Sequence, residues 1–426
     1  MQEKYFVEEN IHLSPLLKSH TYTQQVGGIF FIESTKEAQT KRNLMTNRIT
    51  TRRQRSARLV IAGGGDGGHV FPGIAVAQEL RRLHPDAKIV FFGTPKGIEA
   101  DIIENAGFHF EALDVEEPAP QTNRINFQIL RRLPGAVLAA MKLLKQQTPK
   151  MILGTGGYVS VPVLYAGYLL RIPTMILESN RQPALANRLL SRSVDKIAVN
   201  FEESTGFFPA KKVMVTGNPV RREFFVVGET PPPNKGHKLN ILVLGGGRGA
   251  RSINYSTIAA LDHLQPYREQ LSFTHQSGSA DFKYVNAGYQ KREFRADVAA
   301  RIDDLPKMYA RAHLVIGGAG ASMVAEIEAS GRSAILIPYS RNENDTEEEL
   351  NAMDLKNRGI AQILSQKDLS GTTLSHAIRH ILEQPEELAQ IWPNSGQQQA
   401  RRATHQVAEA CLHLVLGQSA DQLNFL

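Results

Sequence analysis

The sequence predicts an α/β protein built from two doubly wound domains that face each other across a cleft. Three observations predict this fold: a length of 426 residues, short apolar runs that alternate with helical stretches, and a restart of this alternation after a proline-rich segment. The length favours two domains of about 150–200 residues each. Continuous apolar strands separated by helices indicate parallel sheets that are covered on both faces.

The first domain is placed at residues 58–228. Its first helical stretch carries Val76, Leu80 and Leu83 at the spacing of a single helix face. The short apolar runs between such stretches are the predicted strands, and they are Leu59–Ala62, Ile89–Phe92, Met151–Leu153, Thr174–Leu177 and Lys196–Val199.

The second domain begins after a stiff polar segment with consecutive prolines, Glu229–Gly236, which is typical of an interdomain linker. We place the linker at 229–238, the second domain at 239–395 and a C-terminal helix at 396–426. The predicted strands here are Ile241–Leu244, Ser272–His275, Leu314–Ile316 and Ala334–Ile337. Open α/β sheets bind ligands beyond the carboxyl ends of their strands, so the facing edges of the two sheets define the predicted binding cleft.

Residues 1–57 differ in character from the rest of the chain. They are polar, follow no strand–helix rhythm, and contain nine Lys or Arg against five acids, which gives +4 of the net charge of +7. The stretch Val26–Ile32 is too short for the apolar region of a secretory signal. We expect a disordered extension. Met45 lies shortly before the first predicted strand, so translation from there is compatible with the fold.

Composition excludes several kinds of site and partner. Cys411 is the only cysteine, which excludes an intramolecular disulfide and a thiolate metal site and suits a reducing cytoplasm. No apolar run reaches the roughly 18 residues of a membrane span. The net charge of +7 suits an anionic lipid surface or phosphorylated substrates. Nucleic acid is not an expected partner, because zinc-finger spacing and ribonucleoprotein aromatic motifs are absent.

Three glycine-rich turns follow predicted strands, and they are Gly63–His69, Gly245–Ala250 and Gly317–Ala321. Glycine lets the backbone approach a ligand closely, and the helix behind each turn offers free N–H groups to phosphate. Each turn alone is also compatible with a tight connection that binds nothing. A dinucleotide dehydrogenase is disfavoured, because no well-placed acid follows Phe92 at the end of the second strand.

A series of short motifs occurs in order along residues 58–415. The motifs are Gly63–Pro72 (GGGDGGHVFP), Gly154–Ser160 (GTGGYVS), Glu178–Asn180 (ESN), Gly217–Arg221 (GNPVR), Gly245–Ala250 (GGGRGA), Ile302–Asp304 (IDD), Gly320–Glu326 (GASMVAE) and Asn351–Ala352 (NA). Together they resemble the MurG glycosyltransferases. That family adds N-acetylglucosamine to lipid I, the undecaprenyl-diphospho-muramoyl-pentapeptide precursor of peptidoglycan, and so forms lipid II.

The resemblance implies a GT-B fold of two Rossmann-like domains. The second domain would hold UDP-N-acetylglucosamine, and the first would hold the lipid-linked acceptor. The resemblance also implies inversion at the anomeric carbon, no required metal or cofactor, and peripheral attachment to the cytoplasmic face of the inner membrane. The sequence agrees on the metal, since we find no DxD-like carboxylate pair at a strand end.

The resemblance carries substrate contacts onto this sequence. Asn180 and Arg221 are expected to reach the donor, and the backbone of Ile302 to meet the uracil edge. Glu326 is expected at the ribose, because a carboxylate can accept hydrogen bonds from both hydroxyls; a solvated acid on the helix surface is the alternative. The predicted substrate contacts are Asp66, Gly67, Gly68, Tyr158, Asn180, Arg221, Gly247, Arg248, Ile302, Ala321, Ser322, Met323, Val324, Ala325, Glu326, Glu347, Glu348 and Asn351.

Inverting transfer needs a base for the acceptor hydroxyl and stabilisation of the leaving diphosphate. His69 closes the first glycine turn, and an ordinary imidazole pKa of about 6.5 suits a base at neutral pH. The alternative for His69 is a hydrogen bond to the turn or to the acceptor diphosphate. Asp66 is the second predicted catalytic residue, either orienting His69 or acting as the base. Arg221, Arg248 and the amides around Gly247 would meet the leaving-group charge.

The sequence departs from the family mainly on the donor side. The positions that differ are Asp66, Leu177, Ser179, Arg248, Gly318, Met323, Glu347 and Glu348. The family has Gln at the position of Glu348, and a carboxylate only accepts hydrogen bonds where an amide also donates. We therefore expect poor use of UDP-N-acetylglucosamine or a preference for another UDP-sugar. Two other functions stay open: a different GT-B enzyme, such as a diacylglycerol sugar transferase or a UDP-sugar epimerase, and a catalytically silent relative that binds UDP-sugar or lipid.

The stretch Arg124–Lys150 mixes apolar residues with Arg131, Arg132, Lys142 and Lys145. A basic and apolar surface helix can lie in an anionic membrane interface, which a lipid-linked acceptor would favour. An ordinary domain helix with a solvated basic face is the alternative.

Overall fold

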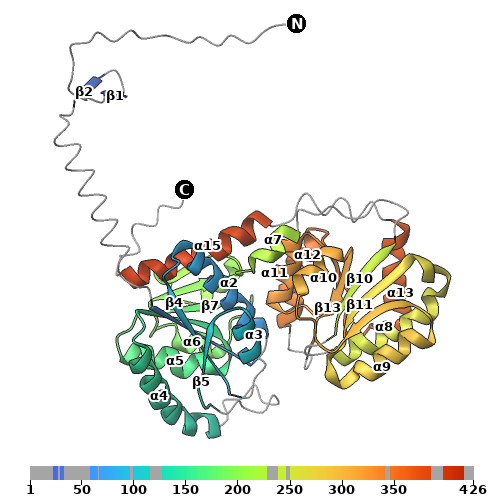
Figure 1. Ribbon diagram of the computed structural model, residues 1–426, viewed down its shortest axis with the longest axis horizontal. Helices are drawn as coiled ribbons and strands as arrows, with labels where there is room; N and C mark the ends of the chain where they lie inside the picture. The colour runs from blue at the N-terminus through green and yellow to red at the C-terminus, as the bar shows by residue number, and fades with distance from the viewer. Residues whose placement is uncertain are drawn as a thin grey trace. The chain divides into compact units, whose positions relative to one another are not determined.

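The computed structural model describes residues 23–26, 29–32, 58–65, 67–95, 99–115, 127–227, 238–245, 250–340, 346–384 and 397–416. Contacts divide the chain into two units, Met1–Ser56 and Ala57–Leu426. The second unit contains two parallel sheets, each with helices on both faces (Figure 1). The predicted fold class of two doubly wound α/β domains is confirmed.

The first sheet has seven parallel strands in the order β5-β4-β3-β6-β7-β8-β9. The strands are β3 (Arg58–Gly63), β4 (Lys88–Gly93), β5 (His109–Ala112), β6 (Met151–Gly156), β7 (Thr174–Glu178), β8 (Lys196–Val199) and β9 (Val213–Val215). The sequence predicts all but the two edge strands, β5 and β9. Those two are short and incompletely buried, so they lack the continuous apolar run of the inner strands.

Helices cover both faces of this sheet. They are α2 (Gly67–Leu83), α3 (Glu99–Asn105), α4 (Phe127–Gln147), α5 (Gly157–Leu169), α6 (Leu185–Leu190) and the 3-10 helix η1 (Glu202–Phe207). Helix α7 (Arg222–Val227) follows β9 in the chain but buries its apolar side chains in a core of the second domain. Leu59 and Ile61 of β3 pack into one hydrophobic core, and Val60 and Ala62 pack into the core on the other face. Burial on both faces explains why β3 is apolar at successive positions.

The second sheet has six parallel strands in the order β12-β11-β10-β13-β14-β15. The strands are β10 (Leu239–Leu244), β11 (Leu271–Gln276), β12 (Arg295–Ala299), β13 (Leu314–Gly317), β14 (Ser333–Leu336) and β15 (Ala361–Ile363). The helices are α8 (Ala250–Leu264), η2 (Gln265–Gln270), α9 (Gly278–Lys291), α10 (Leu305–Arg311), α11 (Ala321–Ser330), α12 (Glu347–Asn357) and α13 (Gly371–Glu383). The sequence again misses the two edge strands, β12 and β15, which are incompletely buried.

In each sheet the strand order reverses beside the first strand. The chain leaves β3 toward β4 and later returns to β6 on the other side, and β10 lies between β11 and β13 in the same way. Loops at such a reversal diverge and leave room for a ligand. All three predicted glycine-rich turns follow strands that flank these two reversals.

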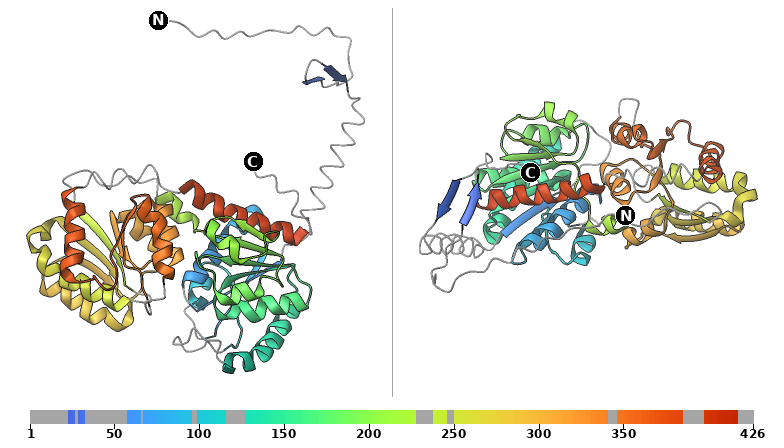
Figure 2. Two further views of the ribbon diagram at one scale, coloured as in Figure 1. Left: turned by 180° about the vertical axis from the view of Figure 1, so that it is seen from behind. Right: turned by 90° about the horizontal axis from the view of Figure 1, so that it is seen from above.

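The C-terminal helix α15 (Gln397–Leu416) packs against α2 of the first domain (Figures 1 and 2). Val407, Ala408 and Cys411 are buried in the same core as Leu59. Burial raises the pKa of the Cys411 thiol to about 12. The sequence predicts this helix but not its position, because an amphipathic pattern does not say which surface the apolar face will cover.

Within the predicted N-terminal extension the structure describes one antiparallel hairpin, β1 (Thr23–Val26) paired with β2 (Ile29–Ile32). The Gly27-Gly28 dipeptide between the two strands is a hairpin signal that the polar character of the segment obscures. The remainder of 1–57 lies outside the described residues, as do residues 229–237 of the predicted linker.

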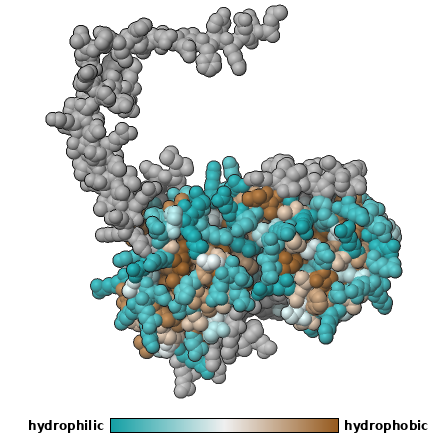
Figure 3. All heavy atoms as spheres, viewed as in Figure 1, coloured by the Kyte–Doolittle hydropathy of each residue, from teal (hydrophilic) through white to brown (hydrophobic). Residues whose placement is uncertain are grey.

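The surface in Figure 3 is mainly hydrophilic, with apolar side chains in small groups. No helix in the described part of the chain is long and apolar enough to cross a bilayer.

Candidate functional site

His69 lies in the first turn of α2, directly after the first glycine-rich turn, and packs against the turn that follows β6. A Cβ on Gly156, which has a φ of +112°, would overlap Nδ1 of the His69 ring. A Cβ on Gly157 would likewise overlap the backbone oxygen of Gly64. The glycines of the GTGGYVS motif therefore create the space in which the imidazole lies.

Ser160 fixes this second turn to the end of β3. Its hydroxyl accepts from the Gly156 N–H at 3.0 Å and lies 2.7 Å from both the Ala62 and the Gly156 carbonyl oxygens. Only one carbonyl can receive the single hydroxyl proton at a time. The sequence shows Ser160 in the motif, but its role follows only from the contact between β3 and β6.

Glu99 supports the first glycine turn from the other side. Its Oε1 accepts hydrogen bonds from the Thr94 N–H at 2.9 Å and the Gly65 N–H at 3.5 Å, and from the Thr94 hydroxyl. Its Oε2 is buried and has no hydrogen-bond partner among the described residues. The sequence gives little signal for Glu99, which lies far along the chain from the turn that it contacts.

Glu178 organises the loop that carries Asn180. The carboxylate accepts from the backbone N–H groups of Asn180 and Ala184, both at 3.0 Å, and from the Asn187 amide at 2.8 Å. Burial raises the pKa of Glu178, and these hydrogen bonds and the nearby charge of His69 oppose the shift. Glu178 and His69 are thus electrostatic neighbours at the predicted acceptor side.

Tyr158 and the residues next to His69 are described only in part. Tyr158 is half-buried against the core, and burial raises the pKa of its phenol while Arg132 opposes the shift. Gly67 and Gly68 form the start of α2. Asp66 lies outside the described residues, so its predicted roles remain predictions.

The second glycine turn is described only at its ends. Gly247 and Arg248 lie outside the described residues. At the start of the turn, the Gly245 N–H donates to the Gln276 carbonyl at 2.7 Å. The side chain of Gln276 accepts from the Ile302 N–H at 2.9 Å, which is the backbone group predicted to meet uracil. Gln276 therefore links the predicted diphosphate turn with the predicted base site.

Helix α11 begins after the third glycine turn, with Gly320 in an extended conformation at its N-cap. The first amides of a helix have no partner within the helix, so those of Ala321, Ser322 and Met323 are available to a phosphate. The Ser322 hydroxyl donates to the Gly68 carbonyl at 2.9 Å, which joins the start of α11 to the start of α2. Val324 and Ala325 turn their side chains into the core, which leaves only their backbone to a ligand.

Glu326 is buried on the next turn of α11, where its carboxylate lies 3.3 Å from the guanidinium of Arg221. Burial raises the pKa of Glu326, and Arg221 opposes the shift. The Arg221 guanidinium also stacks on the Phe71 ring, 4.3 Å from its centroid. The structure thus brings together two residues predicted at the donor, and the alternative of a solvated surface acid is wrong for Glu326.

Glu348 lies in the first turn of α12 beside the half-buried Glu347. Its Oε2 accepts from the Ala319 N–H at 2.9 Å and the Tyr339 N–H at 2.8 Å. Glu348 therefore fastens the loops after β13 and β14 to each other. Asn351, one turn further along, is fully buried, and its amide contacts Asn180 at 3.2 Å.

These contacts join residues that are far apart in the sequence into one region at the carboxyl ends of both sheets. It includes His69 and Asn180 from the first domain and Ser322, Glu326 and Asn351 from the second. Among the described residues, no group of three or more His, Cys, Asp or Glu side chains could hold a metal ion.

Comparison with protein families gives two adjacent matches. Residues 59–199 match the glycosyltransferase family 28 N-terminal domain, and residues 240–407 match the glycosyltransferase family 28 C-terminal domain. The first match covers β3 to β8 of the first sheet, and the second covers the strands of the second sheet.

Curated relatives cover nearly the same part of the chain. The UDP-N-acetylglucosamine--N-acetylmuramyl-(pentapeptide) pyrophosphoryl-undecaprenol N-acetylglucosamine transferase of Anaeromyxobacter sp. (strain K) is 37% identical over 358 residues, 84% of this chain and 93% of that protein. The protein of the same name from Syntrophus aciditrophicus is 36% identical over 360 residues, 84% of this chain and 99% of its own length.

Solved structures agree with the fold. The crystal structure of Acinetobacter baumannii MurG superposes with a TM-score of 0.62 at 27% identity, covering 83% of this chain and 99% of that one. A UDP-GlcNAc 2-epimerase from Neisseria meningitidis, solved with UDP-GlcNAc, gives a TM-score of 0.57 at 13% identity, covering 83% and 99% of the two chains. The epimerase shares the fold alone.

Proposed function

Because this chain belongs to the MurG family of glycosyltransferases, we propose that it transfers N-acetylglucosamine from UDP-N-acetylglucosamine to lipid I with inversion, forming lipid II for peptidoglycan synthesis. One observation carries the proposal onto this structure: Ser322 donates a hydrogen bond to the Gly68 carbonyl. That contact puts the residue before His69 at the start of the helix whose free amides suit a sugar nucleotide.

On the acceptor side, His69 is the proposed base. It takes the proton from the acceptor hydroxyl as that oxygen attacks the anomeric carbon of the donor. Glu178 is close enough for its charge to act on His69, and an ionised Glu178 favours the imidazolium that forms. The Gly156 turn fixes the position of the ring, because the imidazole lies against backbone that carries no side chain.

On the donor side, the bond from the anomeric carbon to the diphosphate breaks and UDP leaves with the negative charge. The amides at the start of α11 and the positive end of its dipole stabilise that charge. Arg221 adds a cation from the segment before α7, and Arg248 is a second candidate. Glu326 accepts from the ribose hydroxyls, and the Ile302 backbone and Gln276 hold the base.

A different UDP-sugar is the second candidate for the donor. It is favoured by Glu348, whose carboxylate faces backbone N–H groups beside the start of α11. A catalytically silent UDP-sugar-binding relative is the remaining alternative. The deciding experiment offers the purified protein a lipid I analogue with a panel of UDP-sugars and follows product mass. Absence of any transferred sugar would contradict the proposal.

The proposal includes peripheral binding to the anionic cytoplasmic face of the inner membrane through helices α4, α5 and α6. Helix α5 packs against both of its neighbours, and none of the three helices contains Asp or Glu. Apolar side chains protrude from each helix, and the exposed large ones among the side chains that the structure describes are Leu138, Tyr165, Tyr168, Leu169, Leu185 and Leu189. Such a surface fits the interface of an anionic bilayer.

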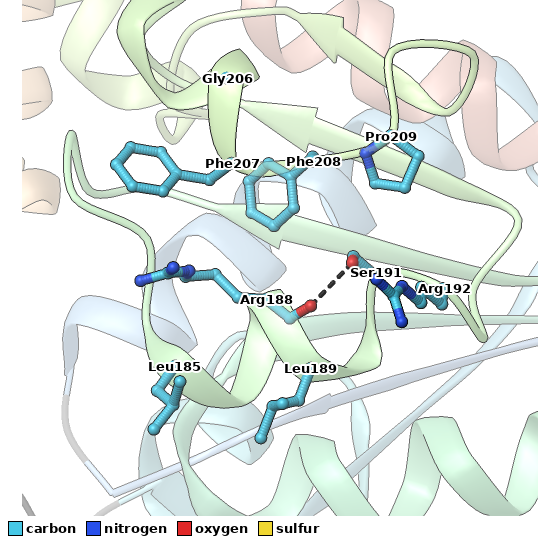
Figure 4. A pocket seen from close by; sticks show the side chains of 9 residues that line it. All are labelled: Leu185, Arg188, Leu189, Ser191, Arg192, Gly206, Phe207, Phe208 and Pro209. Atoms are coloured by element: carbon cyan, nitrogen blue, oxygen red, sulfur yellow. Dashed lines mark hydrogen bonds between the residues drawn. The ribbon is translucent and has the colours of Figure 1, made fainter.

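A shallow groove of about 440 Å³ lies beside α6 on this surface (Figure 4). Its lining is Leu185, Arg188, Leu189, Ser191, Arg192, Gly206, Phe207, Phe208 and Pro209. The Arg188 guanidinium lies 5.0 Å from the centroid of the Phe207 ring, so a cation and an apolar surface occur side by side.

Vesicle sedimentation tests the membrane assignment. Replacing Arg188 and Arg192 by Glu should abolish binding to vesicles rich in phosphatidylglycerol, whereas Lys283→Glu on α9 of the second domain should leave it intact. Equal loss with both proteins would point to non-specific charge attraction and contradict the assignment to α6.

A further inference from the structure

Two buried asparagines, Asn218 and Asn351, each join the loop after β7 to the turn before α11. The loop, residues 179–181, carries Asn180 and belongs to the first domain. The turn, residues 319–321, opens the helix proposed to hold the donor phosphates. Asn218 has an exposed fraction of 4% and Asn351 of 0%.

Asn218 lies on the segment that connects β9 with α7. Its Oδ1 accepts from the Ser179 hydroxyl at 2.9 Å, and its Nδ2 donates to the Ala321 carbonyl at 3.2 Å. One amide therefore spans the loop and the turn, with its acceptor used on one side and its donor on the other.

Asn351 on α12 repeats the arrangement. Its Oδ1 accepts from the Arg181 N–H at 3.2 Å, and its Nδ2 lies 3.2 Å from Asn180 Oδ1 and 3.5 Å from the Ala319 carbonyl oxygen. A backbone N–H can only donate, which fixes the orientation of this amide. Neither a carboxylate nor an apolar side chain could make both sets of bonds.

We infer that Asn218 is a positioning residue that, with Asn351, couples donor binding at residues 319–321 to the conformation of loop 179–181. The inference rests on the proposed function in placing the donor phosphates at the start of α11. A donor that orders the turn then also orders the loop, because the two share buried hydrogen bonds whose loss leaves polar atoms unpaired. Coupling between sites is reciprocal, so an acceptor that orders the loop must tighten UDP binding by the same factor.

The test uses UDP as the probe and hydrogen exchange as the readout. In the wild-type protein, UDP should slow exchange in residues 317–327 and also in 179–187, where the Arg181 amide reports its bond to Asn351 directly. In Asn218→Asp, a carboxylate still accepts from Ser179 but repels the Ala321 carbonyl, whereas the bridge through Asn351 stays. UDP should then protect 317–327 as in the wild-type protein and 179–187 markedly less.

Asn200→Ala is the matched control. Asn200 donates to the Ser179 carbonyl at 3.0 Å, so it holds the same loop from within the first domain. UDP should still protect both segments in this variant. Ser179→Ala is the second test variant, because it removes only one hydroxyl and keeps Asn218 in place; it should weaken protection of the loop without abolishing it.

Kinetics supply an independent readout. In Asn218→Asp, kcat/KM for the acceptor should fall about tenfold, while the Kd for UDP alone should change by less than about threefold. The inference would be overturned if UDP protected residues 179–187 as strongly in Asn218→Asp as in the wild-type protein. It would also be overturned if Asn200→Ala lost this protection to the same extent as Asn218→Asp. If UDP protects neither segment in the wild-type protein, the donor-site assignment is wrong and the inference fails with it. Wild-type protection of 317–327 alone would overturn only the coupling.

Discussion

The guanidinium of Arg221 and the carboxylate of Glu326 lie 3.3 Å apart, although 105 positions separate them in the chain. Arg221 belongs to the segment between the two sheets, and Glu326 belongs to α11. Both residues are predicted to contact the donor, so each has a protein partner in this structure that a bound UDP-sugar would replace or share.

The first prediction concerns Glu326 and the ribose. Glu326→Gln should weaken UDP binding about 10- to 100-fold, the usual effect of losing hydrogen bonds to a charged group. The wild-type protein should bind 2′-deoxy-UDP less tightly than UDP, and Glu326→Gln should lose most of that discrimination. Calorimetry with both nucleotides measures it. If Glu326→Gln distinguishes UDP from 2′-deoxy-UDP as well as the wild-type protein does, Glu326 pairs with Arg221 and does not contact the ribose.

The second prediction concerns His69. His69→Ala should lower kcat by about 10²- to 10⁴-fold, the usual contribution of a general base, with UDP affinity nearly intact. Single-turnover assays and UDP titration separate the two effects. His84→Ala, just beyond the end of α2, is the control and should retain activity. Wild-type turnover in His69→Ala would refute the catalytic role, and a collapse of UDP affinity would refute the division of substrates between the domains.

The third prediction concerns Glu348 and the donor sugar. Its hydrogen bonds from the Ala319 and Tyr339 N–H groups end on one oxygen, Oε2, and the amide oxygen of a Gln can accept both. The amide NH₂ can in addition donate to a sugar hydroxyl, which a carboxylate cannot do. Glu348→Gln should therefore fold normally and shift donor preference toward UDP-N-acetylglucosamine. Steady-state kinetics with several UDP-sugars measure the shift, and Glu349→Gln, exposed on the same helix, is the control. If the wild-type protein uses UDP-N-acetylglucosamine efficiently and Glu348→Gln uses it no better, the carboxylate at this position does not alter the donor preference.

The fourth prediction concerns the buried His275. Its ring nitrogens lie 3.1 Å from the Tyr289 hydroxyl and 2.9 Å from Asn254 Oδ1, and the Asn254 amide in turn donates to Asp281 on α9 at 3.0 Å. Burial lowers the pKa of His275 to about 3. Below the ordinary imidazole pKa of about 6.5 the unfolded chain binds a proton that the folded protein rejects, so stability falls as pH drops from about 6.5 toward 3.

This group contributes at most about 1.4 kcal/mol to the free energy of unfolding per pH unit. His275→Gln should remove that part of the slope, although the variant starts from a lower stability. Urea unfolding between pH 7 and 5 measures both slopes. The same replacement at the exposed His263 is the control, and an unchanged slope in His275→Gln would contradict the argument.

The fifth prediction compares the two ends of the chain. Removing residues 1–44 should leave the melting temperature and the activity unchanged, because this part of the sequence has no periodic apolar face to bury. Removing residues 397–426 should destabilise the first domain strongly, because Val407, Ala408 and Cys411 fill its core. Thermal unfolding distinguishes the two, and a large drop after the N-terminal truncation would refute the first half.

The sequence by itself determined the two-domain α/β fold and all of the inner strands. Strands such as β3 and β13 are buried on both faces, so their apolar runs are continuous and their glycine-rich turns stand out. In edge strands such as β12, the exposed polar residues Arg295 and Asp297 interrupt the half-buried apolar ones, so no continuous apolar run marks the strand. The motifs, through their resemblance to the MurG family, also led to His69, Arg221 and Glu326 as candidate site residues.

Only the tertiary structure decided what these residues contact. The pairing of Arg221 with Glu326, the place of His69 over Gly156, and the bridges through Asn218 and Asn351 join positions far apart in the chain. Such contacts depend on which strand lies beside which and on where the connecting segments run. A buried amide is recognised as a bridge only when its donor and its acceptor both have partners, and those partners come from different parts of the fold.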